Sequence, residues 1–88
     1  MKTKPARLGT EYARQAISTK YLGPTNVRGS RVKATAEAGS LTLSWDDALD
    51  SYANHAAAAL MLANKFNWGG VWYGGGTGHG YVFVDTEV

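Results

Sequence analysis

Apolar residues recur at helical intervals between Ser44 and Phe66, which is the longest regular pattern in the chain. An amphipathic helix places residues three, four and seven positions apart on one face, and that face packs against the rest of the protein. The stripe with this spacing comprises Leu49, Tyr52, Ala53, Ala56, Leu60 and Ala63, and it is flanked by His55, Ala59, Leu62 and Phe66. We therefore expect the opposite side to face water, namely Asp50, Asn54, Ala58 and Lys65.

Signals for both ends of this helix are present. Ser44 followed by Asp47 fits a variant of the capping box, in which a hydroxyl accepts a hydrogen bond from the first turn. Gly69 and Gly70 are predicted to end the helix, because glycine adopts the left-handed conformation easily. The four alanines at 56–59 permit close approach of the helix to a sheet.

Short stretches of alternating apolar and polar residues predict strands on both sides of the helix. Before the helix, alternation places Ile17, Thr19 and Tyr21 on one face, then Val32, Ala34 and Ala36, then Leu41, Leu43 and Trp45. After it, two further strands are expected at 71–76 and 81–84, joined by a glycine-rich loop. The turn-rich segment 23–30 separates the first two strands.

The expected fold is α+β, with the order strand, strand, strand, helix, strand, strand. Because consecutive strands usually pair, we predict a small antiparallel sheet of about five strands with the helix packed on one face. The last hairpin could join this sheet or lie apart as a flap. Residues 1–14 are predicted to be a flexible basic arm and residues 15–88 a single domain, as a monomer or a homodimer.

Charge is distributed unevenly although the formal net charge is only +2. Residues 1–33 contain eight basic side chains and one acid, whereas residues 34–88 contain one basic side chain and six acids. The two halves could balance each other within the fold, or the basic half could contact nucleic acid or an acidic protein surface. No apolar run approaches the length of a membrane span and no signal peptide is recognisable, so we expect a soluble cytoplasmic protein without membrane contact.

The sequence contains no pattern that predicts catalysis. It lacks cysteine, a nucleophile-elbow motif and the H-E-x-x-H zinc motif. The glycine loop at 74–80 does not fit a phosphate-binding loop, because its glycine spacing differs and it joins two strands instead of opening a helix. We therefore expect no enzymatic activity, no catalytic residue, no cofactor and no metal site.

Two groups of residues are candidates for binding. The basic group comprises Lys20, Arg28, Arg31 and Lys33, which could follow a phosphate backbone, engage an acidic protein groove or simply be solvated. The aromatic group comprises Trp72, Tyr73, His79 and Tyr81, which lie beside or among glycines. Large aromatic side chains in such positions often anchor interfaces, but in a small domain they are as often part of the core.

The segment 79–84 partly matches the RNA-binding RNP1 strand, whose aromatic residues stack on bases. Tyr81 and Phe83 would share a strand face, as stacking requires. The match fails at His79, Val82 and Thr86, and we favour the alternative that one pair of this strand, either Tyr81 and Phe83 or Val82 and Val84, fills the core.

Residues 20–34, KYLGPTNVRGSRVKA, together with the segment 74–84, resemble a family of small uncharacterised proteins from phages, prophages and bacterial genomes. The resemblance implies a mobile-element context and covers the chain from about residue 18 onward; residues 1–17 look like an extension beyond it. In the host cytoplasm such a protein would bind a host protein complex, for example a nucleic-acid-dependent defence effector that it inhibits as anti-CRISPR proteins do. The alternative is a nucleic-acid-binding protein that uses the basic loop and the aromatic strand.

Overall fold

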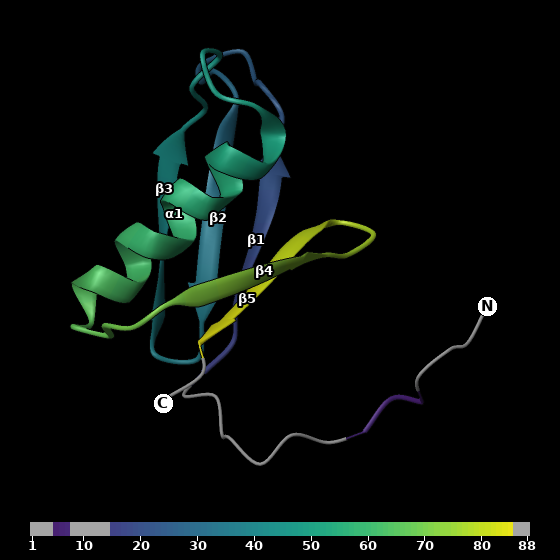
Figure 1. The fold of residues 1–88 in the computed structure, drawn as a ribbon. Coiled ribbons are helices and arrows are strands. Elements are labelled where there is room, and N and C mark those ends of the chain that lie inside the picture. The colour runs from purple at the N-terminus through teal and green to yellow at the C-terminus, as the bar shows by residue number, and fades with distance from the viewer. Residues whose placement is uncertain (1–4, 8–14, 86–88) are drawn as a thin grey trace.

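The computed structural model describes residues 5–7 and 15–85, which form one five-stranded antiparallel sheet and one helix (Figure 1). The strands and helix follow the order β1 (Ile17–Leu22), β2 (Arg31–Ala36), β3 (Gly39–Ser44), α1 (Ser51–Lys65), β4 (Trp72–Gly76) and β5 (Gly80–Asp85). This arrangement confirms the predicted α+β fold and its element order. Most of the arm predicted at 1–14 lies outside the described residues.

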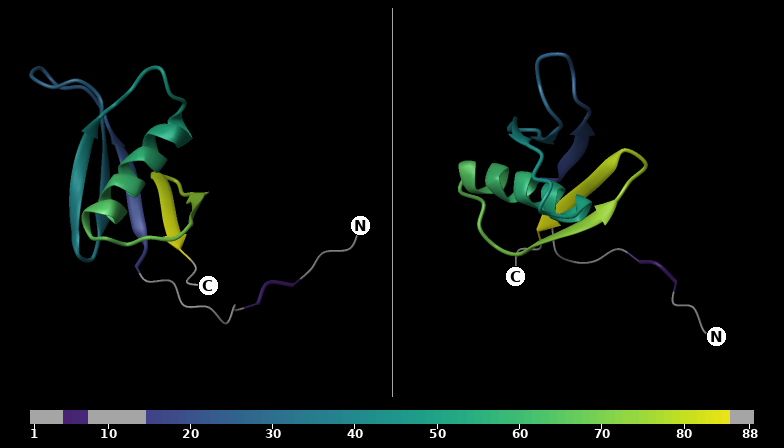
Figure 2. Two further views of the ribbon diagram at one scale, coloured as in Figure 1. Left: turned by 60° about the vertical axis from the view of Figure 1, so that its left-hand side comes forward. Right: turned by 90° about the horizontal axis from the view of Figure 1, so that it is seen from above.

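The sheet has the strand order β3-β2-β1-β5-β4, so the last hairpin belongs to the same sheet as the first three strands. The connection is the β1–β5 pair, in which Ile17 lies opposite Phe83 and Lys20 opposite Gly80. The β4–β5 hairpin crosses the direction of β1–β3 at a steep angle (Figure 1). Helix α1 lies on one side of β1–β3, and no other described helix or strand covers their opposite side (Figure 2).

The core lies between α1 and the sheet, and strand alternation selects its members. Ile17, Val32, Ala34 and Phe83 point from the strands toward the helix and are buried. From the helix they meet small side chains and one leucine, namely Ala58, Ala59, Leu62 and Ala63. These alanines let the helix approach the sheet closely, as predicted for 56–59.

The predicted orientation of the helix is wrong in part: His55, Ala59, Leu62 and Ala63 are buried as expected, but the buried face also includes Asn54 and Ala58. Asn54 and Ala58 were expected to face water, yet both are buried. Leu49, Tyr52 and Leu60 were assigned to the packed stripe, yet all are exposed, Leu60 by 46%. The side chain of Asn54 is buried because its amide hydrogen-bonds the backbone of the loop that precedes the helix.

The predicted start of the helix is also wrong, whereas its end lies within one residue of the predicted Phe66 but is not made by the glycine pair. Ser44 belongs to β3, and the N-cap is Asp50, six residues later than predicted. Its carboxylate accepts a hydrogen bond from the amide of Ala53 at 2.8 Å, and the helix begins at Ser51. At the other end the helix stops at Lys65, and Asn67 takes the left-handed conformation with φ 59° before the glycine pair is reached. No described helix is long and apolar enough to span a membrane.

Candidate functional site

The sheet face that points away from α1 carries cationic and hydroxyl side chains. We call it the open face; its residues on β1, β2, β3 and β5 are Ser18, Lys20, Leu22, Arg31, Lys33, Thr35, Ser40, Thr42, Ser44, Gly80, Val82 and Val84. Alternation places them there, because their neighbours Thr19, Val32 and Ala34 are buried under the helix. Three of the four basic residues singled out in the sequence therefore share one surface.

Lys20 and Lys33 lie directly opposite each other in the β1–β2 pair. Arg31 lies two residues before Lys33 on the same strand and opposite Ser44 of β3. None of the carboxylates that the structure describes lies on this face. Glu37 lies in the β2–β3 turn, Asp85 is buried on the helix side, and Asp46, Asp47 and Asp50 lie in the loop before α1.

A groove of about 440 Å³ crosses the open face at the lysine pair. Lys20, Lys33, Thr35 and Val82 line it from the strands, and Thr77 and His79 line it from the β4–β5 turn. The hydroxyl of Thr77 accepts hydrogen bonds from the amides of His79 and Gly80, at 3.2 and 3.0 Å. The turn therefore holds the exposed His79 beside the two lysines.

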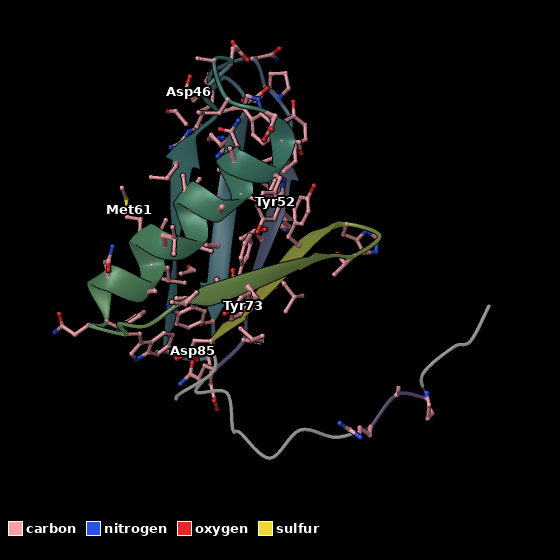
Figure 3. The ribbon with its side chains drawn as sticks, viewed as in Figure 1. Asp46, Tyr52, Met61, Tyr73 and Asp85 are labelled. Carbon is pink, nitrogen blue, oxygen red and sulfur yellow. The ribbon has the colours of Figure 1, made fainter. Side chains whose placement is uncertain are left out.

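Arg28 lies outside the strands, in the β1–β2 loop, and it borders a second hollow of about 510 Å³. We call this the end hollow; it is lined by Arg28, Ser30, Arg31, Ser44, Trp45 and Asp47. It lies where the β1–β2 and β3–α1 loops meet at one end of the sheet, the end at which Asp46 is labelled (Figure 3). Arg31 and Ser44 belong to both the open face and the end hollow.

The aromatic candidates divide between the core and the surface. The ring of Tyr81 packs on the helix side, with its centroid 4.8 Å from that of His55 and 5.1 Å from that of Tyr52. Phe83 is buried in the core, so its ring is not available to stack on a base, and Tyr81 is partly buried beside the core. Tyr81 also borders the groove, and its contribution to binding stays a prediction.

The two aromatic residues of β4 point in different directions. Trp72 is half-buried and stacks on Trp68 with a centroid distance of 6.1 Å, so both indoles contribute to the packed side. Tyr73 is 58% exposed and is labelled on β4 in Figure 3. It alternates with Trp72 and therefore lies on the same side of the sheet as the open face, at the sheet edge.

Sequence reasoning missed a buried polar cluster at the centre of the helix–sheet interface. His55 is only 3% exposed, and its Nδ1 lies 2.7 Å from the hydroxyl oxygen of Thr19, in a hydrogen bond. Burial lowers the pKa of His55 from its ordinary value of 6.5, because desolvation disfavours the charged ring. No local pattern identifies this pair, since its two members lie 36 residues apart.

The described residues contain no group of three or more histidine or carboxylate side chains that could hold a metal ion. Comparison of the chain with family models, curated proteins and solved structures finds no match. The resemblance to the phage and prophage family therefore stays a prediction.

Proposed function

We propose that this protein is a non-enzymatic module that binds nucleic acid through the open face of its sheet. The observation that carries the proposal is the direct opposition of Lys20 and Lys33 on a face without a described carboxylate. Like charges directly opposite each other destabilise a strand pair. An anion bound between the two ammonium groups removes that repulsion, so the arrangement is unfavourable for the free chain and favourable for a complex.

A polyanion fits this face better than a single small anion. Consecutive residues on one side of a strand are about 6.8 Å apart, so Lys33 and Arg31 offer two separate cationic positions in a row. The hydroxyls of Thr35 and Thr42 lie beside them and are donors for phosphate oxygens. Such contacts position a sugar–phosphate backbone without reading its sequence.

The test is a salt series of binding curves, measured by fluorescence anisotropy with labelled single-stranded and double-stranded DNA and RNA. Each phosphate contact lowers the logarithm of the binding constant by about 0.7 per logarithmic unit of salt on a single strand. Replacing both Lys20→Gln and Lys33→Gln should make the slope shallower by about 1.4 and weaken binding to all sequences alike.

Lys65→Gln is the matched control, because it removes one cation from the end of α1, on the side away from the open face. Its salt slope should equal that of the unchanged protein. Flat binding curves at low salt for all four nucleic acids would eliminate the proposal. Equal weakening by Lys65→Gln and by either Lys20→Gln or Lys33→Gln alone, each of which removes one charge, would show that total charge, and not the open face, drives the binding.

A second candidate is the capture of a host protein complex by a mobile-element protein, which is the function that the family resemblance implies. One observation favours it. Val27, at the tip of the β1–β2 loop, is 87% exposed and stands next to Arg28, so an apolar and a cationic side chain project together from the fold. Arginine is enriched among the residues that dominate the binding energy of interfaces, and the exposed apolar side chain beside it adds surface that a partner can bury.

The two candidates are separated by the residues on which each depends. A pull-down from host lysate should recover a specific protein complex with the unchanged chain and with the Lys20/Lys33 double variant, but not with Val27→Ser. Recovery of no specific protein, together with full host defence activity in cells that express the chain, would remove the second candidate.

A further inference from the structure

The end hollow contains two arginine side chains that form no ion pair with any residue in the described part of the chain. Arg31 Nε donates only one long hydrogen bond, of 3.4 Å, to the carbonyl oxygen of Gly29. Guanidinium groups present several N–H donors in a planar fork that matches the oxygens of a phosphate. The donors of Arg28 and Arg31 therefore remain available to an anionic ligand.

The walls of the hollow are fixed by contacts between the two loops. The amide of Trp45 donates to the carbonyl oxygen of Ser30 at 2.9 Å, and the hydroxyls of Tyr21 and Ser30 share a hydrogen bond of 2.8 Å. The ring of Tyr21 also packs edge-on against Trp45, with a centroid distance of 5.0 Å. A ligand that enters this hollow does not first have to order its walls, which preserves binding free energy.

The charge pattern changes sign across the hollow. The cations of the open face continue through Arg31 to Arg28 in the β1–β2 loop, whereas Asp47 of the β3–α1 loop brings a carboxylate to the same hollow. Asp46 and Asp50 follow in the same loop. A phosphate backbone that lies on the open face is attracted by Arg31 and Arg28 and is repelled where it would pass the carboxylates of the β3–α1 loop. The favourable ligand at this position is therefore the end of a nucleic-acid strand.

We propose that the end hollow binds a phosphate monoester, supplied by the terminal phosphate of a nucleic-acid strand that lies on the open face. A terminal monoester carries more negative charge than an internal diester and has an additional oxygen for the two arginines. The hydroxyls of Ser30 and Ser44 complete the set of donors, and Trp45 supplies the apolar wall against which the last nucleoside packs. The inference rests on the proposed function for the strand, but the phosphate site can be tested without it.

The first experiment compares single strands of one sequence with a 5′-phosphate, with a 3′-phosphate or with neither, in competition against a labelled strand bound to the full 88-residue chain. One phosphorylated end should bind about tenfold more tightly than the unphosphorylated strand, the usual effect of one charge-assisted contact. Arg28→Gln should abolish this preference, and the control Lys65→Gln should retain it. A linear single strand, which has an end, should bind more tightly than a circular one. Asp47→Asn should reduce this difference, because it removes a carboxylate that repels a backbone continuing past the arginines.

Equal affinity for all three linear strands would overturn the inference, and salt-dependent binding of the same strands would still support the proposed function. The second experiment uses mononucleotides and needs no strand. Addition of 5′-AMP should shift the amide NMR signals of residues 28–31 and 44–47, and adenosine should not. If these shifts occur and no oligonucleotide binds, the hollow binds the monoester of a free nucleotide and the proposed function is wrong. If neither 5′-AMP nor inorganic phosphate moves these signals, the phosphate site does not exist.

Discussion

The side-chain amide of Asn54 forms two hydrogen bonds with the backbone of Asp46, accepting from its amide nitrogen at 2.8 Å and donating to its carbonyl oxygen at 2.9 Å. The side-chain nitrogen of Asn54, Nδ2, also lies within hydrogen-bond distance of the carbonyl oxygens of Leu49 and Asp50, at 3.3 and 3.2 Å. One buried side chain, only 2% exposed, therefore ties the whole β3–α1 loop to the first turn of the helix. This loop forms one wall of the end hollow.

Asn54→Ala should lower the free energy of unfolding by about 2–4 kcal/mol, because it leaves buried backbone groups of the loop without their partner. Urea denaturation measures this change. Asn64→Ala is the matched control, since Asn64 lies on the same helix and is exposed. It gains the same helix propensity, about 0.6 kcal/mol, without losing the network. Equal effects of the two substitutions would show that the network contributes nothing.

The stability of the fold should depend on the protonation of His55. Because burial lowers the pKa of this ring below 6.5, the unfolded chain takes up the proton first as the pH falls. The free energy of unfolding should therefore be complete above about pH 6.5 and should decline as the pH falls toward the pKa of the folded state. The slope from one proton is at most about 1.4 kcal/mol per pH unit.

Other groups also titrate between pH 4.5 and 7.5. The contribution of His55 is therefore isolated by comparing the urea denaturation of two variants across this range. His55→Gln should flatten the part of the profile just below pH 6.5, whereas His79→Gln, at the exposed histidine of the β4–β5 turn, should keep it. A profile that His79→Gln changes and His55→Gln does not would contradict the assignment.

The lysine pair should limit stability while it supports binding. Lys20→Glu and Lys33→Glu each convert a repulsive cross-strand pair into an attractive one and should stabilise the fold by about 0.2–1 kcal/mol. The double substitution restores a like-charge pair and should lose that gain. Each single variant should at the same time bind nucleic acid more weakly. If high salt leaves the differences in stability unchanged, their origin is not electrostatic.

Two glycines are required by close packing and not by flexibility. A Cβ at Gly80 would overlap the carbonyl oxygen of Thr19 on β1, and a Cβ at Gly74 would overlap the ring of Phe83. Gly80→Ala should therefore destabilise the fold by at least about 3 kcal/mol, by separating β5 from β1. Gly75→Ala is the control, since no atom lies within 4 Å of its Cβ position, and it should change stability by less than about 0.5 kcal/mol. Amide hydrogen exchange of β1 reports the separation directly.

The strands and their order along the chain were predictable, because alternation is a local signal, as in Ile17, Thr19 and Tyr21, but the pairing that joins the last hairpin to the sheet was left open. The helix was predictable for the same reason, but its orientation was not. Alanine occupies nearly every side of the segment 56–59, so the choice of face depended on Tyr52 and Leu60. The packed face is instead decided by the small side chains that approach the sheet and by two polar ones, Asn54 and His55, whose partners lie outside the helix.

The candidate site was predictable only in part. The sequence singles out Lys20, Arg31 and Lys33 by their charge, and alternation places each on a definite side of its own strand. Their juxtaposition depends on register, which sets Lys20 opposite Lys33 and is a property of the pairing rather than of either strand. Trp45 and Asp47 gave no binding signal, because they line the end hollow only after two separate loops have met.

The pairing of Ile17 with Phe83 means that the middle of the sheet joins the first and the last described strands, 66 positions apart. During synthesis, β1 therefore waits for its second neighbour until almost the whole described chain has left the ribosome. Until then its hydrogen-bonding edge is exposed, and it is open to pairing with other chains. We expect folding to be slow, because the central strand pair joins distant segments of the chain. We also expect the nascent chain to depend on chaperones until the β4–β5 hairpin has been synthesised.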